Sequence, residues 1–221
     1  MIKRDYILRM IEDFFQALRR IQALKRGQDW RSAETELDHE FQQLIGAGPQ
    51  AVAALTETEL LAKLISGEST QTVHQKTLML VSLLKEAGDV AIGQGRIQEG
   101  NVIYLKGLHL LLQALASQEP FEFPEFVPKV EIFVASLQEA VVPLETHALL
   151  MQHYERLGEF ARAEDELFAM LDAEPGNRRI AEFGLAFYER LSGHSDAQLM
   201  AGGLPRPELE SGIAEVRKRL G

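Results

Sequence analysis

Residues 147–175, HALLMQHYERLGEFARAEDELFAMLDAEP, form the stretch that decides the fold. Their apolar side chains recur at steps of three and four residues, which is the period of an amphipathic α-helix. Gly158 interrupts the pattern and predicts a turn between two helices. The tetrapeptide YERL at residues 154–157 recurs at residues 188–191, an offset of 34 residues. The chain is therefore expected to contain repeated helical hairpins.

This hairpin resembles a tetratricopeptide repeat (TPR). With Gly158 as the turn glycine, the consensus positions of that family are occupied by Leu150, Tyr154, Phe160, Ala163, Leu167, Met170 and Pro175. A second match covers residues 83–112, LLKEAGDVAIGQGRIQEGNVIYLKGLHLLL, with Gly95 at the turn. Small residues at Gly88 and Gly100 would let its two helices approach closely. The two turn glycines are 63 residues apart, so the repeats are unevenly spaced.

Helical periodicity also dominates outside the two hairpins. Asp29 is a candidate N-cap for a second helix, and Thr56 with Glu59 forms a capping box. A polar, glycine-rich loop is expected over residues 192–206, before a short last helix. We therefore predict an all-α fold, a TPR-like α-α superhelix of about ten helices in antiparallel hairpins with irregular repeat spacing.

The composition breaks once, at residues 119–128 (EPFEFPEFVP). Prolines at this density disfavour helix and sheet interiors, so an extended linker is expected, with its phenyl rings anchored on helices. We predict a single domain over residues 1–221. Its expected sub-regions are N-terminal helices (1–68), a repeat-like hairpin (72–118), the Pro/Phe linker (119–128) and C-terminal repeats (143–221).

The first helix, over residues 6–24, has an apolar arc of about 200° on a helical wheel. A helix that packs on one neighbour needs only about half of that arc. The helix is therefore either wedged between two layers or half-buried in a homodimer. We favour the wedge, because terminal repeats of solenoids usually have polar outer faces. Both a monomer and a homodimer remain open.

A second resemblance, to another family, covers most of the chain and rests on three segments. They are YILRMIEDFFQALRRI at residues 6–21, the KRG turn at 25–27 with its A-E-x-E-L helix at 33–37, and YERLGEFARAEDELF at 154–168. On these segments the sequence resembles a family of bacterial proteins of similar length, a domain of unknown function with no assigned activity. The resemblance implies the helical fold and a bacterial source.

The sequence lacks the residues and motifs that several types of catalytic and metal site require. Cysteine is absent, which excludes disulfides, thiol nucleophiles and cysteine-bound metals. Neither a phosphate-binding glycine loop nor a G-x-S-x-G motif occurs. Glu36 and His39 form a single E-x-x-H on one helix face, whereas a carboxylate-bridged metal pair needs two. We therefore predict no catalytic residue, cofactor or metal site. An enzyme whose site is assembled from distant residues remains an alternative.

Charge argues against a protein that coats nucleic acid. The chain has 23 Lys and Arg against 33 Asp and Glu, a formal net charge of −10. A nucleic-acid-associated or regulatory role would use the basic residues of the N-terminal helix, Arg19, Arg20, Lys25 and Arg26. No apolar segment is long enough for a signal peptide or a membrane span, so we expect a cytoplasmic protein without a membrane partner.

The leading hypothesis is a non-enzymatic helical-repeat protein that serves as a protein–protein interaction module or scaffold. The resemblance to TPRs places a partner groove on the first helices of the hairpins, at Lys85, Asp89, Gln152, Glu155, Arg156, Glu182, Glu189 and Arg190. An acidic peptide tail near Asp89, Glu155, Glu182 and Glu189 would be repelled by about 1 kcal/mol per close pair. The partner is therefore expected to be a basic peptide or an amphipathic helix with basic flanks.

Overall fold

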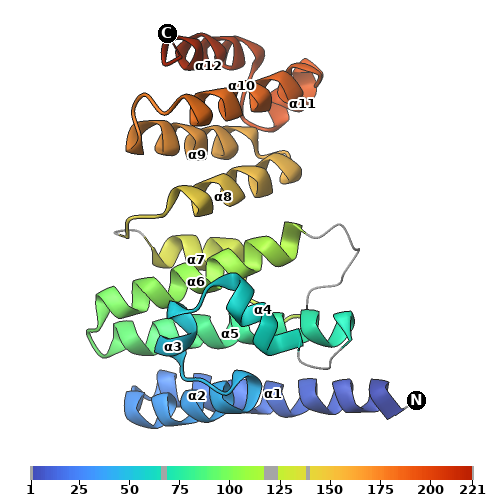
Figure 1. Ribbon diagram of the computed structural model, residues 1–221, viewed down its shortest axis with the longest axis vertical. Coiled ribbons are helices and arrows are strands. Elements are labelled where there is room, and N and C mark those ends of the chain that lie inside the picture. The colour runs from blue at the N-terminus through green and yellow to red at the C-terminus, as the bar shows by residue number, and fades with distance from the viewer. Residues whose placement is uncertain (1, 66–68, 117–123, 138–139, 221) are drawn as a thin grey trace. The chain divides into compact units, whose positions relative to one another are not determined.

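A computed structural model describes residues 2–65, 69–116, 124–137 and 140–220, which contain twelve α-helices and no strand (Figure 1). They divide into two compact units, residues 1–140 and 141–221. Unit 1 contains α1 (Ile2–Arg26), α2 (Trp30–Ile45), α3 (Pro49–Ala54), α4 (Glu57–Ile65), α5 (Thr70–Gly93), α6 (Ile97–Ala116) and α7 (Val130–Ser136). Unit 2 contains α8 (Leu144–Leu157), α9 (Phe160–Ala173), α10 (Arg178–Ser192), α11 (Asp196–Ala201) and α12 (Arg206–Lys218). The prediction of an all-α fold is confirmed.

Two short helices were not predicted from the sequence. α3 begins at Pro49, whose fixed φ suits the first helical position. α11 begins after Ser195, which forms a capping box with Gln198 inside the stretch predicted to be a glycine-rich loop. The predicted caps are confirmed: Asp29 accepts a hydrogen bond from the Ser32 amide, and Thr56 and Glu59 cap each other. No described helix is long and apolar enough to cross a membrane.

The core of unit 1 is the hairpin of α5 and α6. Gly95 at its turn has φ +79°, a conformation that favours glycine. A Cβ atom on Gly100 would lie 2.7 Å from the Ile92 side chain and 3.2 Å from the Gly88 carbonyl oxygen, so the predicted close approach is present. α1 and α2 pack on α5, α7 packs on α6, and α3 and α4 cover the hairpin (Figure 1). α5 is consequently buried along most of its length.

α1 contacts both α2 and α5, as the internal-wedge hypothesis requires. Its buried residues are Phe14, Ala17, Leu18 and Ile21, whereas Leu8 in the N-terminal half is 51% exposed. The ring of Phe126, from the Pro/Phe linker, packs edge-on against Phe14 at a centroid distance of 5.3 Å. The anchoring of the linker is therefore confirmed at Phe126. Residues 121 and 123, which carry the other two rings, lie outside the described residues.

Unit 2 begins with the hairpin of α8 and α9, whose turn residue Gly158 has φ +76°. Tyr154, Leu167 and Met170, which occupy TPR consensus positions in the sequence, are all at most 3% exposed and belong to the core of this hairpin. α10 packs on α9 and α12, and α11 contacts α12. Tyr188, the repeat counterpart of Tyr154, is 1% exposed. The two tyrosines of the YERL repeat therefore occupy equivalent, buried positions in their helices.

Candidate functional site

The predicted groove residues fall into two groups. Lys85 and Asp89 lie on α5 in unit 1. The other six lie on α8 and α10 in unit 2, at Gln152, Glu155, Arg156, Glu182, Glu189 and Arg190. We call these six residues the α8/α10 face. Each group is described within its own unit.

One bidentate ion pair organises the α8/α10 face. The Arg190 guanidinium donates hydrogen bonds of 2.6 and 2.7 Å to the two carboxylate oxygens of Glu155. This bonding raises the pKa of Arg190 above its usual value. Glu182 pairs with Arg178 at 2.9 Å, and both side chains are largely exposed. The face is therefore a polar, charged surface.

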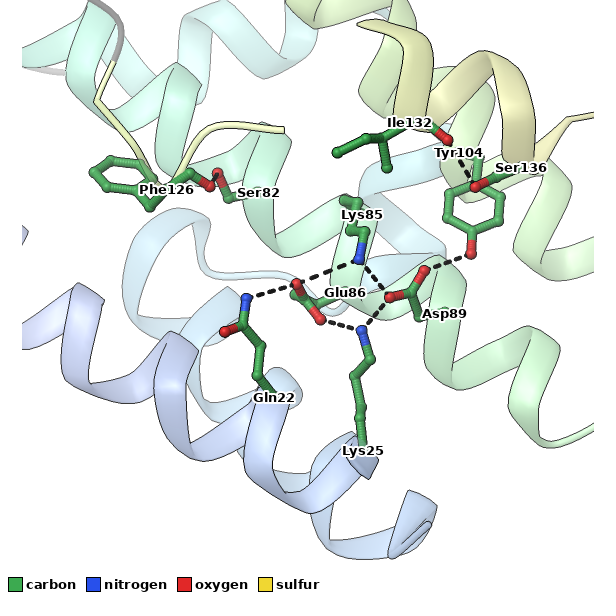
Figure 2. A network of polar contacts seen from close by, with 10 residues as sticks. All are labelled: Gln22, Lys25, Ser82, Lys85, Glu86, Asp89, Tyr104, Phe126, Ile132 and Ser136. Carbon is green, nitrogen blue, oxygen red and sulfur yellow. Dashed lines mark hydrogen bonds and ion pairs between the residues drawn. The ribbon is translucent and has the colours of Figure 1, made fainter. Parts of the chain in front are cut away.

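Lys85 and Asp89 belong to a denser polar group, which we call the lysine–carboxylate cluster (Figure 2). Its members come from three helices and are Gln22 and Lys25 of α1, Lys85, Glu86 and Asp89 of α5, and Tyr104 of α6. Both lysines converge on Asp89, with the Lys85 Nζ 2.6 Å from its Oδ2 atom. The Tyr104 hydroxyl donates to Asp89 Oδ1 at 2.6 Å. Lys25 also binds Glu86, which accepts a further hydrogen bond from Gln22 at 3.2 Å.

Burial strengthens the electrostatics of the cluster. The Lys25 and Glu86 side chains are only 13% and 5% exposed. Burial disfavours the ionised form of Asp89, but Lys25, Lys85 and Tyr104 outweigh this effect and lower its pKa. Burial likewise opposes the charge on Lys85, but Glu86 and Asp89 raise its pKa above the usual value. Burial and the bond to Asp89 raise the pKa of Tyr104. The contacts within the cluster therefore favour the ionised forms of Asp89 and Lys85 and the neutral form of Tyr104.

Local sequence explains only the α5 and α6 part of the cluster. Gly88 makes room for Tyr104, because a Cβ atom there would lie 2.4 Å from the tyrosine Cε1 atom. The contribution of Lys25 was not predicted, because its partners lie 61 and 64 residues away along the chain. The available signal was the presence of three charged residues, Lys85, Glu86 and Asp89, in the C-terminal half of α5, whose other residues are mostly apolar.

A cavity of about 540 Å³ lies beside the cluster. Its lining includes all six members of the cluster together with Arg26, Trp30, Ile92 and Gly93. The Trp30 ring packs over Gly93, where a Cβ atom would lie 2.7 Å from the indole. The cavity therefore combines three cationic side chains with aromatic and aliphatic walls.

A second cleft of about 640 Å³ is lined by residues of α1, α2 and α5, among them Arg20, His39 and Glu40. Burial raises the pKa of Glu40, with Glu36 and Asp13 adding to this effect against His39 and Arg20. Among the described residues, no group of three or more His, Asp or Glu side chains is arranged to hold a metal. Glu36 of the E-x-x-H pair instead binds Arg20 at 2.6 Å.

The basic residues of the N-terminal helix are partly engaged within unit 1. Arg20 binds Glu36, Lys25 belongs to the cluster, and Arg19 stacks on the Phe15 ring at 4.4 Å. Arg26 lines the cavity. The four cations predicted for a nucleic-acid surface therefore lie in four different environments.

Comparison with known proteins places the chain in a family. Neither the curated proteins nor the solved structures contain a significant match. A family model, described as a family of unknown function, matches residues 1–221. The match covers the lysine–carboxylate cluster and the α8/α10 face alike. The chain belongs to the family of unknown function DUF6483.

Proposed function

We propose that the chain is a non-enzymatic, TPR-like helical-repeat protein that binds another protein through the α8/α10 face. The observation that carries this proposal is the bidentate Glu155–Arg190 pair, whose residues are 35 positions apart on α8 and α10. It joins α8, the first helix of the α8/α9 hairpin, to α10. In TPR-type solenoids the first helices of the hairpins line the binding surface. A bacterial, cytoplasmic setting belongs to the same proposal.

The charge of the face favours a basic ligand. Its six residues include three carboxylates and two guanidinium groups. Arg190 is committed to Glu155, whereas Glu189 is exposed and has no ion-pair or hydrogen-bond partner in the described part of the chain. A lysine or arginine of a ligand would therefore find a free carboxylate on α10. A basic peptide or an amphipathic helix with basic flanks fits this surface.

Asp89 contributes little to this preference. Its carboxylate is already compensated by Lys25 and Lys85, so it would not repel an acidic ligand as strongly as an isolated carboxylate would. The expected discrimination against acidic tails therefore rests on the α8/α10 face, and chiefly on Glu182 and Glu189.

Fluorescence anisotropy with the full-length chain tests the proposal. Two labelled peptide sets of equal length, one acidic and one basic and amphipathic, are titrated at low and at physiological salt. We expect the basic set to bind, with an affinity that falls as salt rises. Glu189→Lys should weaken this binding about tenfold, because it replaces an attraction with a repulsion.

Glu210→Lys is the matched control, since Glu210 is an exposed glutamate of α12 in the same unit. The control should change affinity by less than about twofold. Tighter binding of the acidic set, or equal effects of the two charge reversals, would contradict the proposed binding face.

A further inference from the structure

Every carboxylate oxygen of the lysine–carboxylate cluster already accepts a hydrogen bond. Asp89 Oδ1 accepts from Tyr104, and Oδ2 accepts from Lys25 and Lys85. Glu86 Oε1 accepts from Gln22, and Oε2 accepts from Lys25. Each of the four carboxylate oxygens therefore has at least one donor within unit 1 (Figure 2). A cationic ligand would therefore meet only carboxylate oxygens that already have a donor in this cavity.

Donors, in contrast, are in surplus. An ammonium group has three N–H bonds, whereas Lys25 contacts two acceptors and Lys85 contacts one within hydrogen-bond distance. Arg26 also lines the cavity, and its guanidinium has no acceptor among the described residues. The Trp30 indole N–H has no acceptor there either. Two ammonium groups, a guanidinium and an indole therefore retain unused N–H bonds.

The balance of charge points the same way. Three cations, Lys25, Arg26 and Lys85, line the cavity with two carboxylates, Glu86 and Asp89. The carboxylates are neutralised by the two lysines, so the charge of Arg26 remains uncompensated. The aromatic surfaces of Trp30 and Tyr104, with Ile92, supply an apolar wall. A volume of about 540 Å³ is in the range of small-ligand sites.

We propose that this cavity binds a small molecule that carries an oxyanion, a carboxylate or a phosphate, on a planar ring. The oxyanion accepts hydrogen bonds from Arg26 and from the spare N–H bonds of Lys25 and Lys85. The ring packs against the indole of Trp30. This site is independent of the α8/α10 face, because all of its residues belong to unit 1.

Intrinsic fluorescence provides a direct test, because Trp30 is the only tryptophan of the chain. The full-length protein is titrated at low ionic strength with phenyl phosphate and with benzoate, which distinguish the two oxyanions. Benzylamine and benzyl alcohol are the cationic and neutral controls of similar size. We expect a saturable change in Trp30 emission with at least one of the two anions and with neither control. The response should weaken as salt is added.

Arg26→Gln is the decisive variant, because Arg26 is exposed and its loss breaks no described contact. Loss of one charge-assisted hydrogen bond should weaken anion binding about tenfold. Arg31→Gln is the matched control: Arg31 is an exposed neighbour of Trp30 that does not line the cavity. It should leave the affinity within about twofold of the original.

Three results would overturn the proposal. The first is the absence of a saturable response to either anion up to about 10 mM, a concentration above the dissociation constant of even a weak, millimolar ligand. The second is equal binding of benzylamine or benzyl alcohol. The third is an equal effect of the Arg26 and Arg31 variants. None of these results bears on the peptide titration of the α8/α10 face, so the two proposals can fail separately.

Discussion

Each unit contains a buried tyrosine that donates a hydrogen bond to a carboxylate, and the two pairs differ in their counter-charges. In unit 1, Tyr104 binds Asp89 at 2.6 Å, and two lysines bind the same carboxylate. In unit 2, Tyr188 binds Glu164 at 2.5 Å, and the nearby charges that act on Glu164 are two further carboxylates, Asp165 and Glu208. The pKa of Asp89 is lowered by the lysines and Tyr104, which outweigh burial. The pKa of Glu164 is raised, mainly by burial.

The difference shows that the same tyrosine–carboxylate hydrogen bond occurs with a carboxylate whose ionised form is favoured and with one whose ionised form is disfavoured. Burial penalises the charged form of both carboxylates. The lysines and Tyr104 outweigh this penalty in unit 1, and Lys25, which lies on α1, joins that helix to α5. The hydrogen bond from Tyr188 favours ionised Glu164, but it does not overcome burial and the two like charges. We therefore expect the surroundings of Asp89 to stabilise its ionised form and the surroundings of Glu164 to destabilise its ionised form.

The largest expected effect comes from removing one cation of unit 1. Lys25→Met leaves Glu86, whose side chain is 5% exposed, with one lysine at 3.7 Å. Breaking a largely buried ion pair should cost about 3 kcal/mol in the free energy of unfolding. Urea unfolding followed by Trp30 fluorescence measures this change. Arg20→Met on the same helix is the control, since its pair with Glu36 is largely exposed and should be worth less than about 1 kcal/mol.

Neutral isosteres of the two carboxylates should have opposite effects at pH 7. Asp89→Asn should destabilise the fold by about 2 kcal/mol, because hydrogen bonds to charged groups are lost. Glu164→Gln should stabilise it, by up to about 1 kcal/mol, because the amide oxygen still accepts from Tyr188 and the repulsion from Asp165 and Glu208 disappears. Chemical denaturation followed by circular dichroism gives both values. If both substitutions changed the free energy of unfolding in the same direction, the neighbouring charges would not explain the difference between the two carboxylates.

The stability effects of these two substitutions should also depend on pH in different ways, and this difference is expected to be smaller. Glu164 has a raised pKa, so its stabilising contribution is complete below 4.5, its ordinary value, and is lost as pH rises through the folded-state pKa. The gain from Glu164→Gln should therefore shrink between pH 7 and pH 4.5. Asp89 has a lowered pKa, so its contribution is complete above 3.8 and is lost as pH falls below that value. The penalty of Asp89→Asn should persist at pH 4.5, and denaturation curves at the two pH values check both trends.

Local patterns predicted the hairpins but not their full number of helices. The turns at Gly95 and Gly158 followed from periodicity and glycine placement, and the resemblance to TPRs placed Tyr154 and Leu167 at consensus positions that are buried here. α3 and α11 were missed because both are six residues long and lie in segments rich in glycine and proline. In α11 the capping box of Ser195 outweighed the loop-like composition of its surroundings.

The candidate sites were predictable only in part, for a physical reason. Lys85 and Asp89 are one helical turn apart, so their proximity follows from sequence alone. Lys25 reaches them across a helix–helix contact that no local pattern encodes. The pairing of Tyr188 with Glu164 is similarly non-local, although the glutamate lies within the repeat that the sequence revealed. Helical periodicity identifies which residues are buried, but it does not specify which buried charges meet.

Carboxyl-carbon NMR titration of the full-length protein tests the central contrast most directly. The side-chain carboxyl signals of Asp89 and Glu164 are assigned with the Asp89→Asn and Glu164→Gln variants and followed from pH 2 to pH 8. The lysines of unit 1 predict that Asp89 titrates below 3.8, and the burial of Glu164 beside Asp165 and Glu208 predicts that it titrates above 4.5. Titration of Asp89 above 3.8, or of Glu164 at or below 4.5, would contradict the account.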